Sequence, residues 1–169
     1  LATKTGWNPG SYGHFYHPDQ VRAQLEGSLK RLGTDHIDLY YLHHCDFGPS
    51  DVYLDDALAV LHEARDRGLI RHIGLSDWDC ERVADRVDRV DPDVVQVYRN
   101  VRDDAYVTSG LSRRVNDGDL GAVFFSPLRH GLLTGKYASP TTFPLGDFRR
   151  SVEDFGDAVV LQGIRRATS

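Results

Sequence analysis

The chain has 169 residues, of which 40% are hydrophobic and 27% are charged, a balance typical of a globular protein rather than a disordered or fibrous one. With 20 Lys and Arg against 25 Asp and Glu, the formal net charge is −5 and the pI is about 5.9, which argues against a general nucleic-acid-binding protein. Apolar runs such as 39–42 and 122–125 are far shorter than the roughly 20 residues of a membrane helix, so we expect no membrane partner. The two cysteines, Cys45 and Cys80, are too few for a disulfide framework and favour a cytoplasmic location.

The first residues indicate that the chain is a piece of a longer product. The sequence contains no Met, and it opens with Leu-Ala-Thr-Lys, a pattern typical of the second half of a strand. We therefore expect a fragment.

Short apolar segments alternate with segments of helical periodicity along the chain. The first strand ends near Lys4, and four more segments rich in β-branched and aromatic residues predict parallel strands buried on both faces, at 37–42, 70–75, 93–98 and 121–125. Apolar residues at helical spacing predict helices at 18–32, 55–67, 83–90 and 111–115 and in the tail from 157. Residues 138–150 are rich in Pro, Thr and Gly and predict a loop.

The order of these elements predicts an α/β fold. Strand ends near residues 4, 43, 76, 96 and 126 have a spacing typical of βα units with right-handed crossovers. Such units build either an open doubly wound sheet or a (β/α)₈ barrel of the TIM type. A complete barrel needs eight units and about 250 residues. We therefore expect an incomplete barrel of about five βα units, with residues 1–169 forming a single partial domain.

Polar residues stand where the predicted strands end. In both architectures the carboxyl ends of the strands build the functional site. One polar residue there is ordinary, because a buried strand has to leave the core, but five strand ends in succession favour a site. The residues are Lys4, His43, Ser76 with Asp77, Gln96 and Ser126. A partly desolvated lysine can lower the pKa of a neighbouring acid, an imidazole can donate to a carbonyl, and serine and glutamine suit a carboxamide.

Two other motifs are weaker. The run His43-His44-Cys45-Asp46 contains metal-ligating residue types, but neighbours on an extended strand point to opposite faces and do not converge on one ion, so we predict no metal site. The run Gly131-Leu-Leu-Thr-Gly135-Lys136 is one residue short of a Walker loop and lacks its Ser or Thr. No Gly-x-Gly-x-x-Gly fingerprint of a Rossmann fold occurs.

Six segments in a set order carry a family resemblance. They are Thr3-Lys4-Thr5-Gly6, Arg31-Leu-Gly-Thr-Asp-His-Ile-Asp-Leu-Tyr-Tyr-Leu-His43, Ile73-Gly-Leu-Ser76, Val95-Gln96-Val-Tyr98, Phe125-Ser-Pro-Leu128 and Gly131-Leu-Leu-Thr-Gly-Lys-Tyr137. Over residues 1–137 the chain resembles the aldo-keto reductases. More narrowly, three motifs resemble nucleotide-sugar reductases of actinomycete deoxysugar pathways, described as NDP-hexose 2,3-enoyl or 3-keto reductases. They are His43-His-Cys-Asp-Phe-Gly-Pro49, Gln96-Val-Tyr-Arg-Asn100 and Phe124-Phe-Ser-Pro-Leu128.

The resemblance implies a (β/α)₈ barrel that binds NADPH in extended form and reduces a small-molecule carbonyl, here on a nucleotide-linked deoxysugar. In this family a Tyr protonates the carbonyl oxygen as hydride arrives, Lys and Asp tune that Tyr, and a His orients the carbonyl. The catalytic residues matched in this chain are Lys4 and His43. The matched cofactor-binding residues are Ser76, Asp77 and Gln96 for the carboxamide, Phe125 for the nicotinamide face, and Ser126 and Leu128 for the diphosphate path.

The chain departs from the family pattern in two places. Asp77 stands where the family often has Asn, and the family's Asp and Tyr lie upstream of Lys4, outside this chain. The isolated fragment is therefore expected to be inactive. The alternatives are a non-catalytic, nucleotide-binding regulatory relative of the aldo-keto reductases or a degenerate gene product, and the presence of His43 favours the enzyme. A metal-dependent barrel hydrolase or isomerase is disfavoured by the ligand spacing. The sequence does not predict the oligomeric state.

Overall fold

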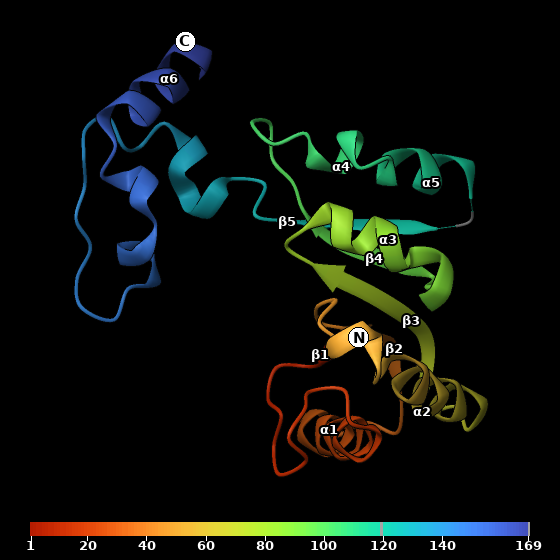
Figure 1. Ribbon diagram of the computed structural model, residues 1–169. Coiled ribbons are helices and arrows are strands. Elements are labelled where there is room, and N and C mark those ends of the chain that lie inside the picture. Colours follow the sequence, from red (N-terminus) through yellow and green to blue (C-terminus); the bar gives the residue numbers. More distant parts are fainter. Residues whose placement is uncertain (119, 169) are drawn as a thin grey trace. The chain divides into compact units, whose positions relative to one another are not determined.

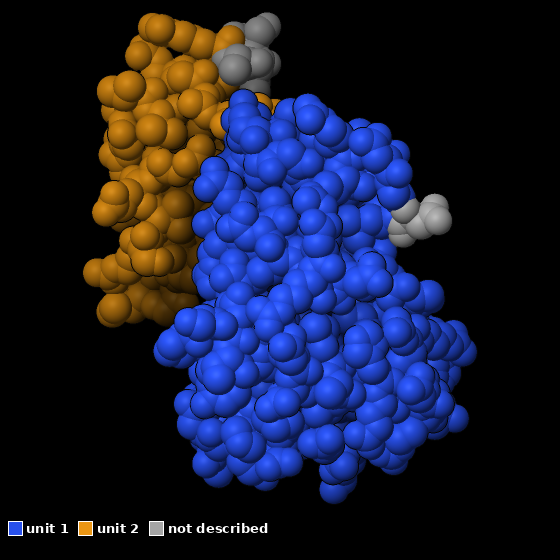
Figure 2. All heavy atoms as spheres, turned by 45° about the vertical axis from the view of Figure 1, so that its right-hand side comes forward, with its two compact units in different colours: residues 1–99, 103–125 blue, residues 100–102, 126–169 orange. Residues whose placement is uncertain are grey.

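A computed structural model describes residues 1–118 and 120–168 of the chain. These residues form two compact units (Figure 2). The first unit comprises residues 1–99 and 103–125, and the second comprises residues 100–102 and the chain from Ser126 onward. Each unit has its own hydrophobic cluster. That residues 1–169 act as a single domain stays a prediction.

The first unit is built on a five-stranded sheet (Figure 1). All neighbouring strands are parallel and lie in the order of the sequence: β1 (Ala2–Thr5), β2 (Ile37–Leu42), β3 (Ile70–Asp77), β4 (Val94–Tyr98) and β5 (Gly121–Phe125). A doubly wound sheet reverses its strand order at a switch point. Among the described residues the order does not reverse, so the incomplete barrel of about five βα units is confirmed.

Helices follow the strands at the predicted places (Figure 1). They are α1 (Pro18–Leu32), α2 (Leu54–Asp66), α3 (Cys80–Val90), α4 (Ala105–Thr108) and α5 (Leu111–Asp117). The end of α1 follows from its glycine: Gly33 adopts a left-handed conformation (φ 65°), and its N–H bonds to the Leu29 and Lys30 carbonyls. Helix α4 was not predicted, because four residues are too few to show helical periodicity.

The two faces of the sheet differ in character. Successive strand residues point to opposite faces, and paired residues share a face. One face packs against the helices and carries buried apolar side chains from the three central strands: Tyr40, Leu42, Ile73, Leu75, Val95 and Val97. The other face carries Lys4, Tyr41 and Gly74 in register. The polar strand-end residues that share this second face are therefore brought to one side of the sheet.

The second unit has little regular structure before its last helix. Three 3₁₀ segments, η2 (Arg129–Thr134), η3 (Phe148–Ser151) and η4 (Glu153–Phe155), precede α6 (Ala158–Thr168). Leu132, Phe155, Leu161 and Ile164 form a small buried cluster that joins them. The predicted helical tail is present. The predicted loop at 138–150 is irregular up to residue 147, but its last part is wrong, because residues 148–150 belong to η3. Across the described residues, no helix is both long enough and apolar enough to cross a membrane.

Buried tyrosines make the stability of the fold sensitive to high pH. Burial raises the pKa of Tyr40 to about 12 and also raises the pKa of the fully buried Tyr16, whereas an unfolded tyrosine titrates near 10. Above pH 10 the unfolded chain therefore binds fewer protons than the folded one, and the free energy of unfolding falls as pH rises. For Tyr40 the loss amounts to about 3 kcal/mol once both states are ionised.

We expect urea unfolding between pH 9 and 12 to show this decline. The variant Tyr40→Phe keeps the ring and removes the ionisable group, so its free energy of unfolding should fall less steeply over the same range. Equal slopes for the two proteins would contradict the assignment.

Candidate active site

The carboxyl ends of the strands enclose a pocket of about 270 Å³ in the first unit. Its lining residues come from four strands, from the residue that directly follows β2 and from the loop after β3: Lys4, His43, Ser76, Asp77, Trp78, Gln96 and Phe125. Six of the eight site residues predicted from the sequence therefore meet around one pocket, although Lys4 and Phe125 are far apart along the chain. Their roles stay predictions.

The sheet register explains this convergence. Lys4 pairs with Tyr41, and His43 lies two residues after Tyr41, so strand alternation puts the three side chains on one face. Ser76 pairs with Gln96 on the same face. Parallel strands end at the same edge of a sheet, and each βα loop begins there, which leaves these polar groups at a common mouth.

Lys4 is held by a hydrogen bond and by an aromatic ring. Its Nζ donates to Oε1 of Gln96 and stands 4.3 Å from the centroid of the Tyr41 ring. Burial lowers the pKa of Lys4 below its usual range. The bond also orients the Gln96 amide: because its oxygen accepts from Lys4, its NH₂ group is the part able to donate to a carbonyl oxygen.

His43 sits half-buried at the end of β2. Its backbone N–H bonds to the Thr5 carbonyl at 2.9 Å, and its imidazole stacks on Trp7 with ring centroids 5.2 Å apart. Burial, and after it the charge of Lys4, hold the pKa of His43 below its usual range. At neutral pH the ring is therefore uncharged and offers one N–H donor, as a group that polarises a substrate carbonyl requires.

Ser76 and Asp77 end β3, and both are buried. The Asp77 carboxylate accepts the Cys45 N–H at 2.7 Å through Oδ2 and the Asp79 N–H at 3.0 Å through Oδ1, and Arg82 Nη1 lies 3.6 Å from Oδ2. The carboxylate thus has partners within the protein. Its predicted contact with a carboxamide stays a prediction.

Aromatic side chains form one wall of the pocket. Phe125 meets Trp78 edge to face, with ring centroids 4.7 Å apart, and Trp78 lies 5.3 Å from Tyr98. Sequence reasoning did not single out Trp78 or Trp7. Each follows a predicted strand-end residue within three positions. This spacing places both in βα loops at the mouth of the barrel, and it is the sequence feature that could have predicted them as pocket residues.

Comparison with known proteins identifies the family. A profile of the Aldo/keto reductase family matches residues 1–159. The chain belongs to the aldo-keto reductase family. It is 34% identical over 156 residues to "Aldo-keto reductase yakc [NADP(+)]" of Schizosaccharomyces pombe, an alignment that covers 89% of this chain and 45% of that protein. It is 31% identical over 118 residues to the "NADH-specific methylglyoxal reductase" of Escherichia coli, covering 70% of this chain and 36% of that protein.

The fold agrees with that of solved aldo-keto reductases. The glycerol dehydrogenase of Gluconobacter oxydans superposes with a TM-score of 0.74 at 25% sequence identity, over 91% of this chain and 46% of that one. This aldo-keto reductase chain thus spans about half the length, or less, of these relatives.

Two predicted residues of this aldo-keto reductase chain lie in the second unit. Ser126 adopts a left-handed conformation (φ 58°) directly after β5, and Leu128 is exposed. They do not line the pocket of the first unit. Their place on the diphosphate path stays a prediction.

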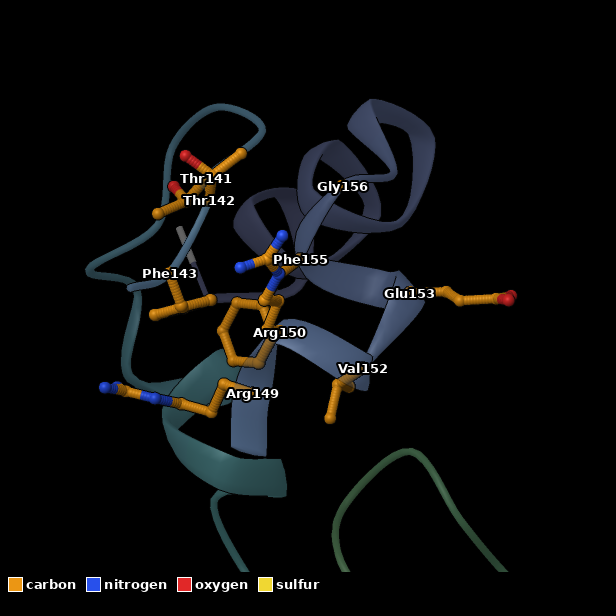
Figure 3. Close-up of a pocket in the computed structure, with 9 residues that line it drawn as sticks. All are labelled: Thr141, Thr142, Phe143, Arg149, Arg150, Val152, Glu153, Phe155 and Gly156. Carbon is orange, nitrogen blue, oxygen red and sulfur yellow. The ribbon is translucent and has the colours of Figure 1, made fainter. Parts of the chain in front are cut away.

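The second unit contains a pocket of its own, of about 340 Å³ (Figure 3). Thr141, Thr142 and Phe143 line it together with residues of η3 and η4. The Arg149 guanidinium donates to Asp147 Oδ2 at 2.5 Å and to Tyr137 Oη at 3.0 Å, and it lies 4.3 Å from the Phe143 ring centroid. None of the predicted site residues lines this pocket.

In the His-Cys run after β2, the His44 ring contacts backbone groups. His44 Nε2 lies 2.5 Å from the Gly6 carbonyl oxygen and its Nδ1 accepts the Asp46 N–H at 3.2 Å, whereas the His43 ring stacks on Trp7. With Nδ1 as the acceptor, Nε2 is the nitrogen placed to donate to the Gly6 carbonyl oxygen. Over residues 1–118 and 120–168 the structure shows no group of three or more His, Cys, Asp or Glu side chains placed to hold a metal ion.

Proposed function

We propose that the protein to which this chain belongs is an NADPH-dependent carbonyl reductase acting on a small-molecule substrate. The observation that supports it is the convergence of an ammonium, an imidazole and an amide, from Lys4, His43 and Gln96, on one pocket. NADPH is favoured by the NADP(+) in the name of the fission-yeast relative, although the bacterial relative is named as NADH-specific. We further propose a nucleotide-linked deoxysugar as the substrate, from the motifs around His43 and Gln96.

The residues present fit a nicotinamide coenzyme. Gln96 offers an oriented NH₂ group, Ser76 a hydroxyl, and Phe125 an aromatic face or edge, at the rim of a pocket large enough for one small ring. A bound NADPH supplies hydride. Ser76 and Gln96 hold the carboxamide, and the neutral His43 donates a hydrogen bond to the carbonyl oxygen, where negative charge develops.

Lys4 acts on the pKa of the acid that protonates the carbonyl oxygen. Its positive charge, held at the pocket by Gln96 and Tyr41, favours the ionised form of a neighbouring acid and lowers that acid's pKa. In this family that acid is a tyrosine paired with an aspartate, which the resemblance places outside this chain. A positioned general acid contributes roughly 10²–10⁴-fold in rate, so we expect the isolated 169-residue chain to be inactive.

The deciding experiment is NADPH oxidation by the complete protein with a panel of aldehydes, ketones and nucleotide-linked keto sugars. Carbonyl-dependent oxidation supports the enzyme, and a preference for the nucleotide sugars supports the substrate. NADPH binding without turnover on any carbonyl would instead support the non-catalytic regulatory protein. No binding of either coenzyme would contradict both and support a degenerate product.

Replacing Gln96 by Ala tests the coenzyme site in the same protein. Because a hydrogen bond contributes about 1 kcal/mol, or more when a charged group takes part, we expect NADPH affinity to fall about ten-fold and kcat to change much less. Coenzyme fluorescence titration measures the affinity. Gln162→Ala, at an exposed position on α6, is the matched control. Unchanged affinity in Gln96→Ala would remove this residue from the site.

We also propose that residues 1–169 form one partial oxidoreductase domain and that the protein works in the cytoplasm. The first rests on the family profile, which runs across both compact units. The second rests on the low cysteine content.

A further inference from the structure

The turn that carries His43 is tied to three separate parts of the fold. Its three successive backbone N–H groups, in residues 43–45, each have an acceptor from a different segment. These are the Thr5 carbonyl of β1 at 2.9 Å, the Tyr16 hydroxyl at 3.0 Å and the Asp77 carboxylate of β3 at 2.7 Å. A turn held at three successive amides has little freedom to change the direction in which His43 leaves the strand.

Asp77 is placed for this task by strand alternation. β3 runs through Asp77, so Ser76 points to the pocket face. Asp77 borders the pocket too, but strand alternation directs its side chain to the helix face, in register with the buried Val97. There its carboxylate is only 5% exposed, bonds to the Cys45 and Asp79 N–H groups, and lies close to Arg82 of α3. Hydrogen bonds to an ionised acceptor are roughly twice as strong as neutral ones.

An asparagine could not reproduce this arrangement. Its amide has one oxygen and one NH₂ group, so it could accept only one of the two backbone N–H groups through its oxygen and would turn a donor toward the other. At this position the aspartate is therefore matched to the two backbone donors that it meets.

Tyr16 holds the middle of the turn. Its hydroxyl donates to the His44 carbonyl at 2.6 Å and accepts the His44 N–H at 3.0 Å, and its fully buried ring packs against His44 and Phe47. Burial raises the pKa of Tyr16, so the hydroxyl keeps its proton and both bonds persist through the neutral range.

We propose that Asp77 and Tyr16 are positioning residues that hold the His43 turn, and that the Asp77 carboxylate serves this turn rather than the coenzyme. The proposal deepens the proposed function, because it assigns how the carbonyl-orienting histidine is aimed. Its geometry does not depend on which carbonyl is reduced.

The first test is a histidine NMR titration of the full 169-residue chain and its variant Asp77→Asn. The groups that act on His43 besides burial are Lys4 and His44, which lower its pKa, and Asp77, which raises it. Neutralising Asp77 should therefore lower the His43 pKa further. Exchange of the Cys45 amide hydrogen should become about ten-fold faster, because a charge-assisted bond is weakened. Asp85→Asn, which removes the same charge at an exposed site on α3, should change neither value.

The second test uses Tyr16→Phe, which keeps the buried ring and removes the hydroxyl. We expect His44 amide exchange to become about ten-fold faster and the cross-relaxation between the Trp7 and His43 rings to weaken. Tyr12→Phe, a change of the same kind in the same loop, should leave both signals as they are. If Tyr16→Phe behaved like Tyr12→Phe, Tyr16 would have no positioning role.

Kinetics of the complete protein separate this proposal from the proposed function. Asp77→Asn should lower kcat while the KM for NADPH stays constant. A raised KM for NADPH, with a His43 titration equal to that of Asp85→Asn, would overturn the positioning role and favour a coenzyme contact. The titration and exchange measurements need no activity, so they support or overturn the proposal even if the protein reduces no carbonyl.

Discussion

Replacing His43 by Ala should lower kcat for carbonyl reduction by the complete protein about 100- to 1,000-fold, the range found when one donor to a developing oxyanion is removed. The uncharged imidazole lines the same pocket as Lys4, and in the proposed function its N–H donates to the carbonyl oxygen on which negative charge develops. NADPH affinity should stay within about two-fold, because the coenzyme contacts are assigned to other residues. Steady-state kinetics and coenzyme titration measure the two effects separately.

Two further variants make the His43 result specific. His43→Gln keeps an N–H donor at this position, and we expect it to recover part of the lost kcat. His62→Ala removes a histidine from α2, away from the pocket, and should leave kcat unchanged. If His43→Ala reduced carbonyls at the normal rate, the site would lie elsewhere. If it lost NADPH binding to the same extent as kcat, the residue would act on the coenzyme.

The strands and the site at their ends could be predicted because each strand is marked by residues that are close together in the sequence. The largely apolar runs in β2 and β4 predict strands of a parallel sheet. The first polar residue after the run in β2, His43, marks its carboxyl end, whereas Gln96 lies inside β4, two residues before its end. Once the strands are parallel, sheet geometry alone brings His43 and Gln96 to the same edge. No contact between distant side chains had to be known.

The direction of Asp77 could not be predicted in the same way. The apolar run predicts a strand that ends at residue 75, whereas β3 continues through Asp77. Only the longer strand extends the alternation that sends Ser76 and Asp77 to opposite faces. The extra pairing depends on β4, where Ser76 meets Gln96 and Asp77 meets Val97, and this is tertiary information.

A substitution at one glycine on the pocket face of the sheet is expected to cause a large loss of stability. Gly74 of β3 pairs with Tyr41 of β2, and a Cβ atom added at Gly74 would overlap the Tyr41 ring at less than 3.0 Å. Tyr41 is itself buried and carries the ammonium of Lys4 over its ring. A side chain at position 74 would therefore displace both.

We expect Gly74→Ala to lower the free energy of unfolding by about 2 to 3 kcal/mol, the upper part of the range for overpacked cores, as measured by urea denaturation. Gly27→Ala, inside α1, is the matched control. There the added methyl meets only the end of the Arg31 side chain, and alanine is the better helix former by about 1 kcal/mol, so stability should hold or rise. In a protein that already carries Tyr41→Leu, Gly74→Ala should lower the free energy of unfolding by less, because the smaller side chain leaves room for the methyl group. If the double variant instead lost as much free energy of unfolding as the two single variants together, the glycine would be needed for a reason other than the Tyr41 ring.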